Sequence, residues 1–108
     1  MNKAIWLILV IQWMGVTQLQ SQIEPLEIGE THTISSKILD ESRQLNIYLP
    51  LGYHQDSIYP VIYALDGSRN EDFLHLVGLV QFYNLQFKME PHIVVGIANV
   101  NRKRDFTF

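Results

Sequence analysis

The chain of 108 residues contains no cysteine. This absence excludes disulfide bridges and a lipid-bearing cysteine near the N-terminus, so the fold must be stabilised by non-covalent interactions alone. Basic residues are also few, eight against eleven acidic ones, and the net charge of −3 provides no basic stripe for nucleic acid. Charged residues make up 18% of the chain and hydrophobic residues 47%, a balance typical of one small globular domain.

Residues 1–21 have the anatomy of a secretory signal peptide. Lys3 is followed by the apolar segment Ala4 to Ile11, and a polar run from Thr17 to Gln22 closes the region. The apolar part is shorter than the roughly 20 residues of a spanning helix, so an uncleaved anchor is the less favoured alternative. We expect an exported protein, periplasmic or extracellular, whose mature domain is 22–108 and which meets the membrane only through its leader. The cleavage site stays open.

Two alternating segments predict an antiparallel hairpin. Residues 31–39 alternate imperfectly, and residues 44–50 alternate cleanly, with Asn46 and Tyr48 on the face opposite Leu45 and Ile47. Between the two segments, residues 40–43 (Asp-Glu-Ser-Arg) supply side chains that bond to the local backbone in turns.

Two continuous apolar runs follow, and each ends in a polar loop. The first is Tyr59 to Gly67 (YPVIYALDG), predicted as a strand over residues 60–65, and the second is His92 to Asn99 (HIVVGIAN). We expect the positive φ of the sharp turn after the first strand to fall on Gly67. The side chain of Asp66 is expected to hold this turn by bonding backbone N–H groups.

A helix is predicted between the two runs. Ser68 or Asn70 is expected to cap it, and the helix should end near Asn84. Its apolar residues recur at the spacing of a buried stripe: Phe73, Leu76, Val77 and Val80. A strand, a crossover helix and a second strand form a βαβ unit, so the fold class is α/β with a mixed sheet, antiparallel first and parallel afterwards. Polar groups should gather at the carboxyl ends of the parallel strands.

The order and spacing of these segments resemble the N-terminal part of the esterase branch of the α/β-hydrolase family. That branch includes siderophore-ester hydrolases, formylglutathione hydrolase and feruloyl-type esterases. The resembling segments are Arg43 to Pro50 (RQLNIYLP), Gly52-Tyr53, Tyr59 to Gly67, Asn70 to His75 (NEDFLH) and Val94 to Thr107 (VVGIANVNRKRDFT). The resemblance therefore implies an incomplete α/β-hydrolase fold.

The resemblance implies hydrolysis of carboxylic esters by a Ser-His-Asp triad, which needs no cofactor. The triad is not present, because no G-x-S-x-G elbow occurs in the chain and the acid and histidine follow later still in the family. Half of an oxyanion hole is implied at the loop after the first parallel strand, where the backbone N–H groups of Gly67 and Ser68 are the candidate donors. An ordinary strand-to-helix turn is the alternative for this loop.

Three residues after the last strand are candidates for the substrate-side rim: Arg102, Arg104 and Asp105. A structural Arg–Asp ion pair is an equally good interpretation. The four histidines are scattered without metal-ligand spacing, so we expect no metal site.

We therefore expect the front portion of an exported serine esterase acting on a small-molecule ester, inactive by itself. A non-catalytic binding module, or a decayed gene product derived from the hydrolase front, is the alternative. Because one helix cannot cover both faces of a parallel sheet, the chain alone should be aggregation-prone. Substrate identity and oligomeric state stay open.

Overall fold

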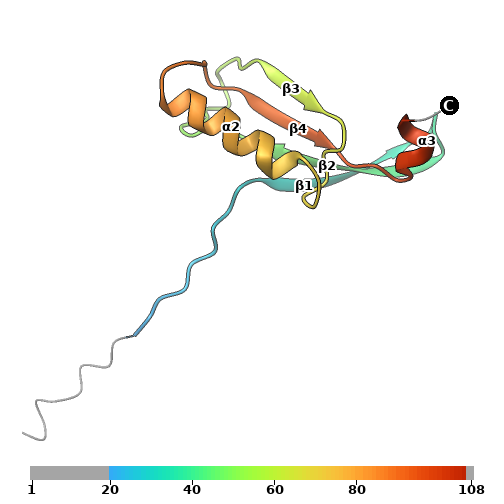
Figure 1. Ribbon diagram of the computed structural model, residues 1–108, viewed down its shortest axis with the longest axis horizontal. Helices are drawn as coiled ribbons and strands as arrows, with labels where there is room; N and C mark the ends of the chain where they lie inside the picture. Colours follow the sequence, from blue (N-terminus) through green and yellow to red (C-terminus); the bar gives the residue numbers. More distant parts are fainter. Residues whose placement is uncertain (1–19, 107–108) are drawn as a thin grey trace, which may run out of the picture.

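The computed structural model describes residues 20–106 and contains one mixed sheet (Figure 1). All but the last two residues of the predicted leader lie outside this range. The strands are β1 (Glu30–Ser36), β2 (Glu41–Tyr48), β3 (Val61–Ala64) and β4 (Ile93–Ile97), and the helices are α2 (Phe73–Leu85) and α3 (Arg102–Phe106). The order of strands in the sheet is β1-β2-β4-β3.

The predicted hairpin is confirmed, but its turn lies earlier than expected. Strands β1 and β2 pair antiparallel from Glu30 opposite Ile47 to Ser36 opposite Glu41. The turn occupies residues 37–40, and residues 41–43, which the sequence predicted to be turn, begin β2. Two local features stabilise this turn, which lies three residues earlier: the Ser36 hydroxyl accepts the Leu39 N–H at 3.1 Å, and Asp40 adopts a positive φ of 51°.

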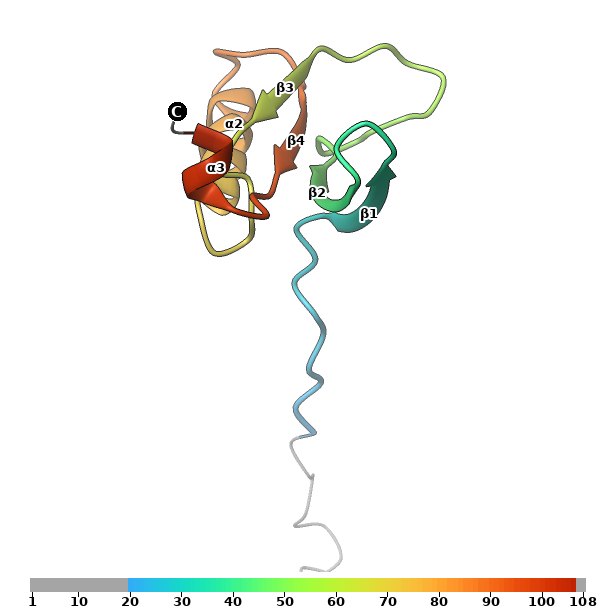
Figure 2. The same ribbon diagram turned by 90° about the vertical axis from the view of Figure 1, so that its right-hand side faces the viewer.

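The predicted βαβ unit is also confirmed. Strands β3 and β4 pair parallel, with Ile62 opposite Val94 and Ala64 opposite Gly96. Strand β4 lies between β3 and β2 and pairs antiparallel with β2, so the hairpin and the βαβ unit share one sheet. The carboxyl ends of β3 and β4 therefore meet at one edge, where the loops that follow them come together (Figure 2).

Helix α2 packs on one face of the sheet and forms the core with it. The predicted stripe is confirmed, because Phe73, Val77 and Val80 are buried against Tyr48 and Val94, and Leu76 packs at the edge of this cluster. The helix begins later than predicted. Its N-cap is Asp72, whose side chain makes no capping bond, because residues 68–71 form a separate turn first.

The second face of the sheet is apolar and largely open. Alternation places Leu45, Ile47, Val95 and Tyr63 on this face, opposite to the face that α2 covers. Exposure is greatest toward β3, where Tyr63 is 70% exposed and Leu65 61%. Among the described elements, only the short helix α3 lies near this face, where its Asp105 contacts Arg43 of β2. No helix within residues 20–106 is long and apolar enough to cross a membrane.

We predict that the isolated chain self-associates through this open face. An exposed apolar face and the free edge of β3 both favour association between copies. Replacing Val61 and Tyr63 by lysine should raise the monomer fraction measured by light scattering after gel filtration. Phe87→Lys, at an exposed apolar side chain that lies after α2 and outside the sheet, should leave the distribution unchanged. A parent chain that is already monodisperse and melts cooperatively as a monomer would contradict this prediction.

Candidate functional site

Backbone hydrogen bonds tie the loop after β3 to the end of β4 and to the start of α2. The Gly67 N–H, three residues beyond the end of β3, donates to the Ile97 carbonyl at the end of β4 at 3.0 Å. The Asp72 N–H donates to the Asp66 carbonyl at 3.1 Å and closes the loop onto the start of α2. These two bonds fix the loop on both sides of Ser68.

Gly67 is required for close packing rather than for a positive φ. The positive φ expected at Gly67 falls on Asp66, at 53°, so that expectation was wrong. A Cβ atom on Gly67 would overlap the backbone of Gly96 and Ile97, and a Cβ atom on Gly96 would meet the Gly67 carbonyl oxygen and the Phe73 ring. The two glycines let the loop lie directly against β4.

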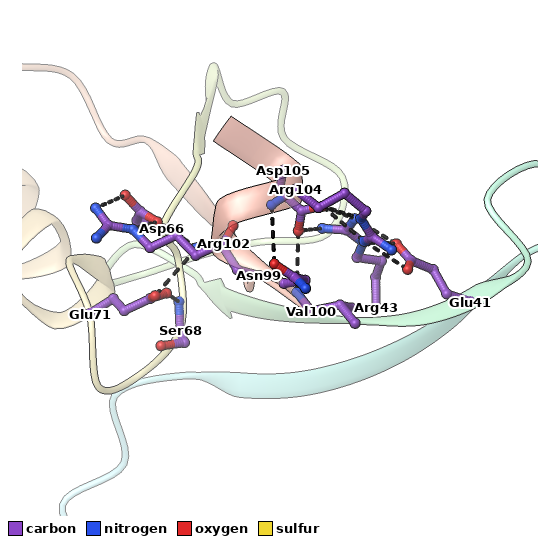
Figure 3. A network of polar contacts seen from close by, with 11 residues as sticks. Glu41, Arg43, Asp66, Ser68, Glu71, Asn99, Val100, Arg102, Arg104 and Asp105 are labelled. Atoms are coloured by element: carbon purple, nitrogen blue, oxygen red, sulfur yellow. Dashed lines mark hydrogen bonds and ion pairs between the residues drawn. The ribbon is translucent and has the colours of Figure 1, made fainter. Parts of the chain in front are cut away.

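The carboxylate of Asp66 links the two loops through side chains. Its Oδ1 accepts a hydrogen bond from Asn99 Nδ2 at 2.5 Å, and Arg102 donates from Nε and Nη2 to the two carboxylate oxygens, each at 3.1 Å (Figure 3). Asp66 was expected to bond backbone N–H groups, so these side-chain partners correct that prediction. The Arg102 guanidinium and then the Asn99 amide hold the pKa of Asp66 below its ordinary value.

The two candidate oxyanion donors have different surroundings. The Gly67 N–H is engaged with the Ile97 carbonyl at the end of β4. The Ser68 N–H donates instead to Glu71 Oε2 at 3.2 Å, and Asn99 Nδ2 lies 3.3 Å from the other oxygen of this carboxylate (Figure 3). The Ser68 N–H thus bonds to a carboxylate oxygen of the same turn, three residues along the chain, and its role as an oxyanion donor stays a prediction.

Two of the three rim candidates belong to an ion-pair cluster at the hairpin end of the same edge. Asp105 accepts two bonds from Arg43, at 2.9 and 3.1 Å, and two from Arg104, at 2.8 and 3.0 Å. Glu41 accepts from Arg43 Nε at 2.7 Å and from Arg104 at 3.1 Å. The cluster fastens α3 to the start of β2. A substrate contact by these residues stays a prediction.

The third rim candidate, Arg102, lies apart from this cluster. Its side chain is 72% exposed and contacts Asp66, close to the loop that carries Ser68. Arg102 is therefore the rim candidate nearest to the candidate oxyanion donor. The histidines lie elsewhere: His32 and His92 each contact a residue two positions away, and no three metal-ligating side chains gather within residues 20–106.

Sequence reasoning missed Asn46, a buried residue that reaches the loop from β2. Its Nδ2 donates to the Gly67 carbonyl at 2.7 Å, and its Oδ1 accepts from the Thr31 hydroxyl at 2.7 Å. The available signal was the alternation itself. Asn46 shares a strand face with Tyr48, and a polar side chain on a buried face needs hydrogen-bond partners.

We predict that Gly96→Ala destabilises the protein strongly, because the added methyl group has no free space between the Gly67 carbonyl and Phe73. Overpacking of this kind typically costs about 1 to 3 kcal/mol. Gly78→Ala is the matched control, since nothing lies within 4 Å of its added Cβ and alanine favours a helix interior by about 0.5 to 1 kcal/mol. Urea unfolding followed by circular dichroism measures both changes. Equal stabilities of the two variants would refute the packing role of Gly96.

We also predict that Asp105 makes stability depend on pH in the acid range. Hydrogen bonds from Arg43 and then Arg104 lower its pKa from an ordinary 3.8 to about 2. A carboxyl whose pKa is lowered in the folded state stabilises above its unfolded pKa, and this contribution is lost as the pH falls from about 4 through 2. Asp105→Asn should be less stable than the parent at pH 7, with the difference shrinking toward pH 2. Asp56→Asn, at a carboxylate 78% exposed, should leave the parent's pH dependence in place.

Comparison with known proteins relates this arrangement to esterases. The family model described as Putative esterase matches residues 36–107. An IroE-like serine hydrolase from Shewanella oneidensis is 39% identical, with a TM-score of 0.66 over 73% of this chain and 25% of that one. The BES protein from Bacillus cereus is 28% identical, with a TM-score of 0.59 over 80% of this chain and 33% of that one. No curated protein matches the chain.

A third similar structure is the feruloyl esterase module from Clostridium thermocellum, determined in complex with sinapinate. It is 26% identical, with a TM-score of 0.51 over 64% of this chain and 26% of that one. The chain spans one fifth to one third of the length of the first solved structures that it matches. Because the family match covers most of its length, the chain belongs to the Putative esterase family, and its mixed sheet and covering helix form part of an α/β-hydrolase fold.

Proposed function

We propose that the complete protein is an exported serine hydrolase of small-molecule carboxylic esters, and that these 108 residues are its front portion. In this proposal they supply one oxyanion donor and part of the substrate rim. A segment beyond them supplies the nucleophile, the acid and the histidine of a Ser-His-Asp triad. Membership of the esterase family and the likeness to a serine hydrolase support the reaction class.

One observation carries the proposal: the Ser68 N–H donates to a carboxylate at the carboxyl edge of the sheet. When a serine oxygen attacks the ester carbonyl carbon, the carbonyl oxygen becomes negatively charged. In this fold, one donor for that charge comes from the residue after the nucleophile and a second from the loop after the third strand. Ser68 lies in that loop, and the loss of one such donor typically costs about 3 to 4 kcal/mol of barrier lowering.

The geometry favours Ser68 over Gly67 as the donor. The Gly67 N–H bonds to the Ile97 carbonyl of β4, so its use would require breaking the backbone bond that ties the loop to the sheet. The Ser68 N–H needs only to exchange the Glu71 carboxylate for the substrate oxygen. The charge that Glu71 places there is therefore an intramolecular substitute for the oxyanion.

The rim supports an ester substrate with a polar portion. Arg102 is largely exposed beside this loop, and its guanidinium can donate to oxygens of a bound ester while it retains Asp66. The feruloyl esterase module complexed with sinapinate makes an aromatic acyl group one candidate. Export would bring the protein to esters outside the cytoplasm. Hydrolysis by a triad needs no cofactor.

A serine-directed phosphonate probe tests whether the nucleophilic serine lies outside these 108 residues. We predict no labelling of the 108-residue chain, because none of its serines lies in a G-x-S-x-G setting. The protein expressed from a reading frame that continues beyond Phe108 should be labelled once and should hydrolyse p-nitrophenyl esters. Stoichiometric labelling of the shorter chain would disprove the assignment of the nucleophile. A frame that stops after Phe108 would support the binding-module alternative instead.

A further inference from the structure

The peptide group between Gly67 and Ser68 is held at both ends by side chains from different elements. Asn46, on β2, donates from Nδ2 to the Gly67 carbonyl at 2.7 Å. Glu71, in the turn before α2, accepts the Ser68 N–H at 3.2 Å. The first contact is buried and the second is exposed, so the peptide group lies between the interior and the site.

Asn46 is the only buried polar or charged side chain among residues 20–106, with 5% of its surface exposed. Its amide has a defined orientation. The Thr31 hydroxyl on β1 donates to Oδ1 at 2.7 Å, so the NH2 group is the end that faces the Gly67 carbonyl. A chain of two hydrogen bonds thus runs from the edge strand through β2 to the loop.

Because the peptide group is planar, the buried contact to the Gly67 carbonyl also determines where the Ser68 N–H points. In a trans peptide, the carbonyl and the N–H of the next residue point to opposite sides. While Asn46 holds the Gly67 carbonyl on the interior side, the Ser68 N–H must point outward, where Glu71 accepts it. If the peptide turned over, the site would present a carbonyl oxygen, which repels an oxyanion.

We propose that Asn46 is a positioning residue that directs the Ser68 N–H toward the reacting oxygen without touching the substrate. This inference rests on the proposed function, and it adds a residue of β2 to the machinery of the loop. Thr31 supports Asn46 by fixing which end of its amide faces Gly67. A purely structural Asn46 would stabilise the fold and leave the transition state unaffected.

Kinetics of the complete protein separate the two roles. Asn46→Asp replaces the donor by a carboxylate oxygen that repels the Gly67 carbonyl, so kcat should fall about 10- to 100-fold with KM nearly unchanged. Asn84→Asp is the matched control, because Asn84 also donates from Nδ2 to a backbone carbonyl, that of Met89, at the far end of α2. It should lose stability and keep its kcat. Equal kcat values in the two variants would overturn the positioning role.

If Asn46→Asp does not fold, a second variant tests the positioning role. Thr31→Val removes only the hydroxyl and keeps the shape of the side chain, which leaves the Asn46 amide free to turn over. We expect kcat to fall about 3- to 10-fold, again with KM unchanged. A kcat equal to that of the parent in folded Thr31→Val would count against the proposal.

Nuclear magnetic resonance distinguishes failure of this inference from failure of the proposed function. A parent protein without esterase activity would overturn the function, and the 15N-labelled amide of Ser68 would then decide the role of Asn46. Its resonance should move in Thr31→Val and in Asn46→Asp, because the hydrogen bond to Glu71 changes, and should stay in place in Asn84→Asp. An unmoved Ser68 resonance in all three variants would refute the orientation of the peptide by Asn46.

Discussion

The contact between Gly67 and strand β4 is the constraint on which the candidate site depends. The Gly67 N–H bonds to Ile97, and both Gly67 and Gly96 lack the side chain that would keep the loop away from the strand. Because the loop lies against β4, the Gly67 carbonyl can accept a hydrogen bond from Asn46 on the neighbouring strand β2. Strand order, two glycines and one buried amide therefore determine where the Ser68 N–H points.

The sequence predicted the four strands and α2 well because their signals are local, but helix α3 lies where a loop was expected. Alternation in residues 44–50, the apolar run before Asp66 and the stripe from Phe73 to Val80 each identified their element, and only the ends moved. The hairpin turn and the start of α2 moved because Ser36, Asp40 and the separate turn at residues 68–71 compete with the expected turn and cap. Such competition between neighbouring polar side chains is decided by backbone geometry that a residue pattern does not contain.

The site was predicted less completely because its partners are distant in the chain. Asp66 and Arg102 were each noticed, but their ion pair joins residues 36 positions apart. The pairing of β4 with β2 brings Asn46 beside Gly67, and no local pattern specifies that strand order. The sequence also could not show why residue 67 is a glycine, since a glycine needed for close packing and one needed for a positive φ look the same in sequence.

In the proposed hydrolase, the hydrogen bond that the Ser68 N–H already makes to Glu71 favours the transition state over the bound ester. The Ser68 N–H already has a charged acceptor in Glu71, so a substrate must exchange a hydrogen bond rather than add one. A neutral ester carbonyl is a weaker acceptor than a carboxylate and gains little by this exchange. The negatively charged oxygen of the tetrahedral intermediate is an acceptor comparable to the Glu71 carboxylate and can replace it at the Ser68 N–H. The donor is therefore released mainly as charge develops, which is the condition under which binding energy accelerates a reaction.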